Sequence, residues 1–325
     1  MARMLARIGL MLASLGAAPA PPVTFTSYTH AFDVFEAQTA GLAPEPRVAA
    51  FRARFDRIAP GLYVDTDPAR LDLRIARALA QFPSIRKRYR DVEARFPAAL
   101  AGAVQAFRAV FPDFVPPMPI VLAHELGERD GGSAYVGGRK TMLFGADVIA
   151  RIHDDDSLRP FLAHELFHLE HARHFPDCDQ FWCPLWQEGL ATYAASVMTP
   201  GATDHQLLLD QPAPIRAPVD ARWAEALCRI AADFDSTKSE AIDGAFTGGN
   251  RPAGSLPARF GYYVGLRIAQ QAGRTRRLPV LARLNDEAAR PVVTAALADL
   301  IRAAHAPCRP PAPGAPITRT APRPA

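Results

Sequence analysis

The sequence lacks several features that would assign a class of protein directly. Beyond residue 20 it has no run of about twenty uninterrupted apolar residues, which excludes a later transmembrane helix. Its formal net charge is only +4 over 325 residues, and acidic residues stand among the basic ones. The densest basic stretch, 86–90, is followed at once by Asp91 and Glu93. We therefore read it as a solvated helix face, and we expect no nucleic-acid partner.

The N-terminus has the pattern of a secretory signal peptide. Arg3 and Arg7 precede a short apolar run, 8–15, which leads into small residues. We predict a signal peptide over residues 1–20 and an exported protein, periplasmic or secreted, with no membrane span after cleavage. An uncleaved N-terminal anchor is the alternative, because Pro21 follows the small residues and fits cleavage badly. No cysteine lies near this junction, so a lipoprotein is not indicated.

Cysteine is scarce, with only four residues in the chain. An even number in an exported protein permits disulfides, and three pairings are open. Cys178 and Cys183 enclose a short loop between two segments, 156–171 and 185–197, that carry the candidate metal ligands. They are either a disulfide or two unpaired small residues.

The spacing of apolar residues predicts a mostly helical α+β fold. Helices are expected across 46–112, with breaks at Pro60-Gly61 and Phe82-Pro83. A short apolar strand follows at 119–123, and Gly137-Gly138 joins two further strands into a hairpin. Further helices are expected at 156–171, 185–197, 218–233, 259–272, 276–284 and 291–304. A small β-sheet therefore precedes the helix that begins near residue 156.

These elements divide the chain into four parts. After the signal peptide, 21–115 is predicted as an N-terminal helical region and 116–305 as a second, larger domain. The proline-rich tail, 306–325, lacks the apolar residues needed to pack and is expected to be disordered.

The sharpest chemical signal is His164-Glu165-Leu166-Phe167-His168. Histidines four residues apart project from one face of a helix and can bind one metal ion through their imidazole nitrogens. Glu165 then lies beside the ion without ligating it. The apolar neighbours bury the helix and leave the histidines at an edge. A purely structural histidine pair is the alternative.

A catalytic zinc site takes three protein ligands and keeps one position for water, so a third ligand is required. Glu188 lies on the next predicted helix. His174 is the alternative, since it stands where a longer His-Glu-x-x-His-x-x-Gly-x-x-His motif has its last histidine. His171 replaces the glycine that lets the chain turn in that motif. We therefore favour His164, His168 and Glu188.

At these residues the sequence resembles a known family. His164 to His168, followed by Glu188 in a Glu-Gly-Leu-Ala-x-Tyr context, resembles the gluzincin metallopeptidases. The segment 259–265 is similar to a Gly-Tyr-x-x-Gly segment of predicted zinc-dependent proteases of bacteria. The resemblance covers roughly 118–272 and implies a gluzincin-like core with Zn²⁺ as cofactor. Thr192 departs from it, because thermolysin-like members often carry an aspartate there that supports the histidines.

The resemblance implies a hydrolase that acts on peptide or protein substrates. Zinc would lower the pKa of a water molecule, and Glu165 would act as general base and then pass the proton to the leaving amine. Tyr262 is our candidate for stabilising the oxyanion. Tyr263 is the alternative, and an ordinary buried tyrosine on a packed helix is the other interpretation of either residue. The hairpin 134–144 can offer an edge to an extended peptide. The alternatives are a zinc-binding protein without catalysis and a metallohydrolase acting on a non-peptide amide or ester.

Overall fold

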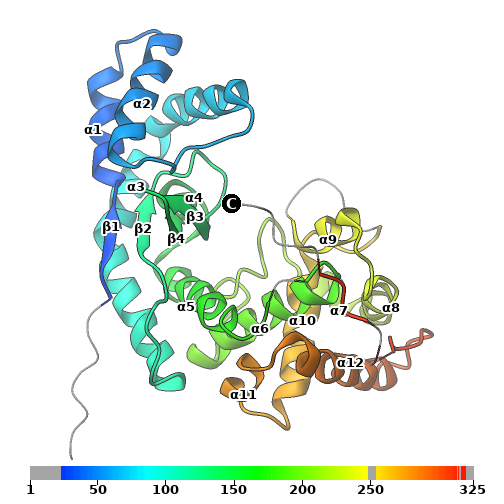
Figure 1. The fold of residues 1–325 in the computed structure, drawn as a ribbon. Coiled ribbons are helices and arrows are strands. Elements are labelled where there is room, and N and C mark those ends of the chain that lie inside the picture. Colours follow the sequence, from blue (N-terminus) through cyan, green and yellow to red (C-terminus); the bar gives the residue numbers. More distant parts are fainter. Residues whose placement is uncertain (1–22, 177, 248–253, 313, 315, 320–325) are drawn as a thin grey trace, which may run out of the picture.

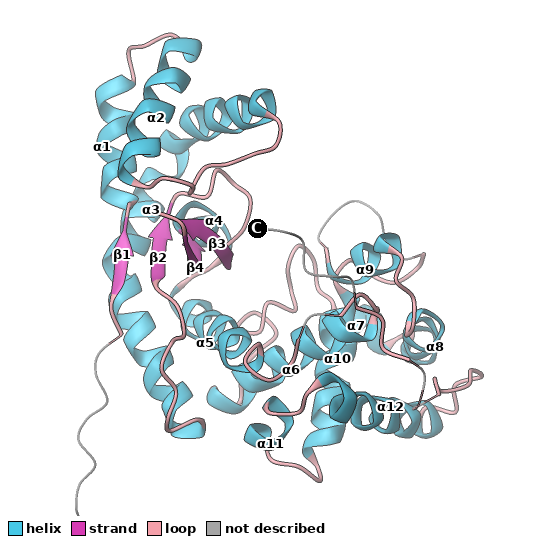
Figure 2. Ribbon diagram, viewed as in Figure 1, coloured by secondary structure: helices cyan, strands magenta, loops and turns pink. Residues whose placement is uncertain are grey.

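The computed structural model describes residues 23–176, 178–247, 254–312, 314 and 316–319. It is mostly helical with one small mixed sheet, which confirms the predicted fold class (Figures 1 and 2). The predicted signal peptide lies outside the described residues. Among the described residues, no helix is long and apolar enough to cross a membrane.

The elements follow the predicted order with a few additions. The strands are β1 (Phe25–Ser27), β2 (Ile120–Ala123), β3 (Gly131–Val136) and β4 (Arg139–Gly145). The helices are α1 (Thr29–Thr39), α2 (Pro44–Ile58), α3 (Pro68–Val110), α4 (Ala146–Ile152), α5 (Asp155–His171), α6 (Trp182–Met198), α7 (Arg216–Asp220), α8 (Trp223–Asp233), α9 (Ser239–Phe246), α10 (Phe260–Gly273), α11 (Leu278–Ala282) and α12 (Asp286–Ala303).

The predicted helix break at Phe82-Pro83 was wrong, because α3 continues through it. A proline inside a helix removes one hydrogen bond and costs about 3 kcal/mol. Here the buried face runs unbroken across the proline, through Leu79, Phe82 and Tyr89. Packing of this face against α1 and α2 outweighs the local cost, and α3 changes direction along its length (Figure 1).

The sheet has the order β1-β2-β4-β3. Strands β1, β2 and β4 are parallel, whereas β3 pairs antiparallel with β4. The predicted hairpin is confirmed: Gly137 and Gly138 both have positive φ angles, 59° and 73°, which suit a two-residue turn between antiparallel strands. Strand β3 therefore forms one edge of the sheet, on the side that faces α5.

Helix α5 begins close to the predicted position. The side chain of Asp154 accepts hydrogen bonds from the backbone N–H groups of Asp156 and Ser157, and the Ser157 hydroxyl accepts one from the Asp154 N–H. This reciprocal cap satisfies free N–H groups at the helix start. It fixes the first turn of α5 and so the rotation of the histidine-bearing face further along.

Helices α6 and α10 cross at two glycines. A Cβ atom on Gly265 would lie 2.6 Å from the backbone oxygen of Leu185, and a Cβ on Gly189 would overlap the Gly265 backbone. Only residues without a side chain allow the two backbones to approach this closely. The contact brings the N-terminal turn of α10, with Tyr262, next to Glu188 on α6.

Gly265→Ala is expected to destabilise the protein by about 1–3 kcal/mol, because the added methyl meets rigid backbone and the two helices must separate. The free energy of unfolding from urea titration measures this loss. Gly41→Ala is the matched control, since its Cβ would meet nothing within 4 Å, and a change within about 0.5 kcal/mol is expected. Equal stability of Gly265→Ala and wild type would contradict the crossing.

Two disulfides, Cys178–Cys183 and Cys228–Cys308, use all four cysteines. The first matches the pair singled out in the sequence. The second ties α8 to the start of the tail. Beyond it, Gln180 receives a hydrogen bond from the Thr318 N–H at 3.1 Å, and Arg319 pairs with Asp286. These residues of the predicted tail thus contact the rest of the protein through a disulfide, a hydrogen bond and an ion pair, and the partly buried side chains of Ala306 and Ile317 pack against the core. Residues 320–325 of the tail predicted to be disordered lie outside the described residues.

Candidate metal centre

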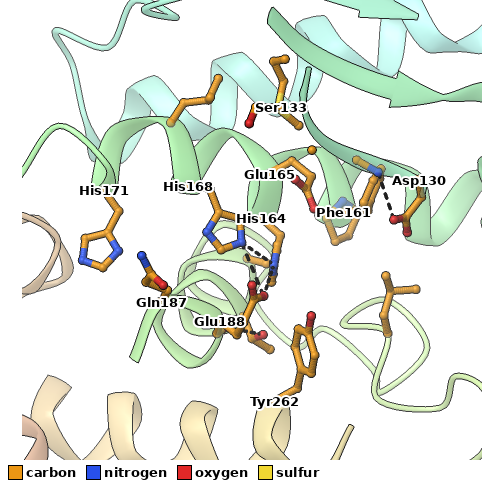
Figure 3. A pocket seen from close by; sticks show the side chains of 18 of the residues that line it. Asp130, Ser133, Phe161, His164, Glu165, His168, His171, Gln187, Glu188 and Tyr262 are labelled. Carbon is orange, nitrogen blue, oxygen red and sulfur yellow. Dashed lines mark hydrogen bonds and ion pairs between the residues drawn. The ribbon is translucent and has the colours of Figure 1, made fainter. Parts of the chain in front are cut away.

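Three side chains from α5 and α6 converge on one point (Figure 3). His164 and His168 lie one turn apart on α5, and their Nε2 atoms are 3.0 Å from each other. An Oε2 atom of Glu188 lies 3.3 Å from the His164 Nε2 and 3.5 Å from the His168 Nε2. The structure thus brings together the three residues that the sequence proposed as ligands, although 24 positions separate His164 from Glu188.

The spacing of these atoms fits a tetrahedral zinc ion. Zinc–nitrogen and zinc–oxygen bonds are about 2.0–2.2 Å long, so two ligand atoms in a tetrahedron lie about 3.4 Å apart. The three observed separations, 3.0, 3.3 and 3.5 Å, fall around this value. Two imidazoles and one carboxylate are also the donor set of a catalytic zinc site. Residues and geometry therefore fit the metal.

His174, the alternative third ligand, does not join this group. Its Nε2 lies 3.7 Å from the Glu170 carboxylate on the same helix. His171 also stays apart from the group: it is buried, and its ring packs between Phe167 and Phe175 with centroid separations of 5.4 and 4.8 Å. Within the described residues, the cluster of possible ligands here consists of His164, His168 and Glu188.

The electrostatics of the cluster reflect its tight spacing. Burial opposes the ionised form of Glu188, but the charge on His168 and the hydrogen bonds from both histidines hold the Glu188 pKa well below its usual range. Burial lowers the pKa of His168, and the charge of Glu188 outweighs it and raises that pKa to about 9. In His164, burial prevails and lowers the pKa. The carboxylate is thus ionised, and the charge of His168 balances its own.

Glu165 projects from α5 into the same pocket, beside His164 and against the start of β3 (Figure 3). A Cβ atom on Gly131 would lie 2.7 Å from the Glu165 Cδ, so the first residue of β3 has no room for a side chain. Burial raises the pKa of Glu165 to about 8, although the charge of His168 acts in the opposite direction. A carboxyl group with a pKa near neutrality is suited to exchange protons as a general base.

The structure separates the two tyrosines of α10. Tyr262 lines the pocket, and its ring centroid lies 6.4 Å from that of His164. Tyr263 is buried on another face of the helix, where its hydroxyl donates to Asp220 at 2.7 Å and accepts from Arg267 at 2.8 Å. Burial, then the charge of Glu188, raises the pKa of Tyr262, so its phenol keeps its proton and can donate a hydrogen bond.

These residues line a pocket with a volume of about 430 Å³. Its walls come from β3, α5, α6, the start of α10 and the loop that contains 206–208. His205 anchors that loop, with its Nε2 3.0 Å from Asp154 and its Nδ1 2.9 Å from Asp210. This wall could not be predicted from the sequence, because neither the loop nor its anchor has a recognisable motif.

Two charged residues of the pocket were not predicted as site residues from the sequence. Asp130 precedes β3, and its Oδ2 lies 3.3 Å from the Nε2 of buried His153. Arg259 precedes α10, and its guanidinium carbon lies 4.4 Å from the ring centroid of Tyr262. Arg259 stands at the start of the Gly-Tyr segment, but nothing in its local sequence identifies what it contacts. The adjacent glycines Gly131 and Gly132 are the feature of the sequence that could have indicated the close approach of β3 to Glu165 on α5.

Thr192 does not replace the aspartate of thermolysin-like proteins. Its hydroxyl donates to the backbone oxygen of Glu188 at 2.8 Å, within its own helix. It therefore steadies the turn of α6 that carries Glu188 and offers the histidines no acceptor.

Comparisons of the chain with protein-family models, with curated proteins and with solved structures found no match.

Proposed function

We propose that the protein is a zinc-dependent peptidase of the gluzincin type, exported to the periplasm or secreted. The observation that carries the proposal is the cluster of His164, His168 and Glu188 at tetrahedral spacing, with Glu165 beside it in the same pocket. A zinc ion held by these side chains supplies Lewis acidity and lowers the pKa of a water molecule that it binds.

The chain's own groups supply the proton transfers and orient the substrate. Glu165 accepts a proton from the attacking water and then delivers it to the leaving nitrogen. The Tyr262 phenol donates a hydrogen bond to the carbonyl oxygen as negative charge develops there. Both groups line the pocket beside the ligand cluster (Figure 3).

The edge strand β3 fits an extended peptide. Its residues 131–133 line the pocket, and among the described residues β4 is the strand that pairs with it, on one side. The Ser133 carbonyl oxygen accepts a hydrogen bond from Arg129 Nη1 at 3.4 Å, which a bound peptide would replace. A peptide that adds to the free edge forms backbone hydrogen bonds at any sequence, with side chains directed alternately to either face. Gly131 and Gly132 leave this part of the strand free of side chains, so the substrate backbone can approach Glu165.

The arrangement favours catalysis over a purely structural metal site. Structural zinc sites are closed by four protein ligands, whereas this cluster has three and opens into a pocket. A structural site also has no use for a buried carboxyl group at Glu165. Hydrolysis of a non-peptide amide or ester uses the same groups, and the edge strand is the feature that favours peptides.

The test combines metal analysis with substrate screening of the purified wild-type protein. We expect about one zinc per chain by elemental analysis, and cleavage of a mixed peptide library that stops after chelation and returns with added zinc. Zinc binding without cleavage of peptides, but with cleavage of simple esters or amides, would change the substrate class. Absence of bound zinc would contradict the metal centre itself.

A further inference from the structure

Arg259 has an unusual backbone conformation at the entrance to α10. Its φ angle is 61°, in the left-handed region that residues with a Cβ atom rarely adopt. Such strain persists only where the surroundings hold the residue in place, and it is concentrated at functional sites. The Arg259 side chain lines the pocket described above. The contacts that hold it therefore indicate what it does.

Main chain and side chain of Arg259 both act on Tyr262. The Arg259 carbonyl oxygen accepts a hydrogen bond from the Tyr262 N–H at 3.1 Å, which begins the first turn of α10. The guanidinium group lies over the Tyr262 ring, with its carbon 4.4 Å from the ring centroid. One further contact fixes the guanidinium: Nη1 donates to the backbone oxygen of Gln211 at 3.1 Å. The phenol is thus held by a side chain that is itself anchored.

The charge of Arg259 is also placed to act through this phenol. Burial and the Glu188 carboxylate raise the pKa of Tyr262, whereas the positive charge of Arg259 acts to lower it. A cation beside a hydrogen-bond donor favours negative charge on the acceptor. Stacking of an arginine on an aromatic face needs the planar guanidinium, which lysine lacks.

We propose that Arg259 is a positioning residue for Tyr262: it holds the phenol beside the His164–His168–Glu188 cluster and strengthens the hydrogen bond that the phenol donates to the reacting carbonyl. The kinetic consequence rests on the proposed peptidase function. The contact of Arg259 with Tyr262 is independent of that function, and the NMR signal of the Tyr262 ring measures it separately.

The kinetic test compares Arg259→Gln, Tyr262→Phe and the double variant. Loss of one oxyanion donor costs about 10²–10³-fold in kcat, which is the loss expected for Tyr262→Phe. Arg259→Gln is expected to lower kcat by about tenfold or more with KM little changed, and to have almost no further effect in the Tyr262→Phe background. The same loss in both backgrounds, or a rise in KM alone, would show that Arg259 acts directly on the substrate.

The second readout needs no activity. Protein with ¹³Cζ-labelled tyrosine contains seven labelled rings, and Tyr262→Phe identifies the signal of Tyr262. Arg259→Gln is expected to shift that signal in zinc-free and zinc-loaded protein, and Arg259→Lys to shift it partly. The matched control is Arg267→Gln, because Arg267 contacts the Tyr263 hydroxyl outside the pocket. It should move the Tyr263 signal and leave Tyr262 in place.

The two readouts separate two kinds of failure. A Tyr262 signal that does not respond to Arg259→Gln in a folded protein, as judged by an unchanged thermal unfolding curve, overturns the positioning role. If the wild-type protein cleaves no peptide, the proposed function is wrong. The NMR signal of Tyr262 then tests the positioning role of Arg259 by itself.

Discussion

Glu165→Gln is expected to lower peptide hydrolysis by about 10²–10⁴-fold and to leave about one zinc bound per chain. The amide has nearly the shape of the carboxylate but accepts no proton at neutral pH. Glu165 lies outside the ligand cluster, on the side of α5 that faces Gly131, so its replacement leaves the three metal-binding atoms in place. Steady-state kinetics and elemental analysis on the same preparation measure both quantities.

Glu170→Gln is the matched control, because it makes the same chemical change on the same helix. Glu170 is buried, and its carboxylate pairs with Arg173 at 3.2 Å, away from the pocket. We expect wild-type kcat and zinc content from this variant, whatever its stability. Undiminished turnover by Glu165→Gln would remove Glu165 from the mechanism, and loss of zinc from that variant would make it a ligand.

Glu188→Ala is expected to weaken zinc binding by more than about 100-fold. Removal of groups that only hydrogen-bond to a metal ligand already costs about 10–100-fold in affinity, and Glu188 supplies a ligand atom itself. Its Oε2 is also the atom that faces both histidine nitrogens, so the variant leaves His164 and His168 without the carboxylate. Zinc affinity is measured by competition with a chelating dye.

His174→Ala is the control for the third ligand, and Glu188→Gln refines the test. His174 is expected to leave zinc affinity unchanged, because its ring faces Glu170. Glu188→Gln preserves the size of the side chain but removes its charge, and it should lose most of the affinity that Glu188→Ala loses. Loss of zinc from His174→Ala with retention in Glu188→Ala would reverse the ligand assignment.

Local sequence predicted those parts of the fold that depend on neighbouring residues. The hairpin at Gly137-Gly138 and the start of α5 were located because turn and capping chemistry act over two to four positions. The break at Pro83 was wrong, because the energy that keeps α3 intact comes from packing with α1 and α2. Helices α1, α4 and α9 and strand β1 were not foreseen as separate elements.

The same distinction between local sequence and tertiary packing holds for the site. Sequence alone determined the pairing of His164 with His168 and the place of Glu165 beside them, because four residues make about one turn of a helix whatever the surrounding fold. The crossing of α6 and α10 at Gly189 and Gly265 was decided by tertiary structure. Tertiary structure also placed Glu188 rather than His174 against the two histidines, Tyr262 rather than Tyr263 in the pocket, and the guanidinium of Arg259 on the phenol. These contacts join residues far apart in the chain, and no spacing rule connects such residues until the helices pack.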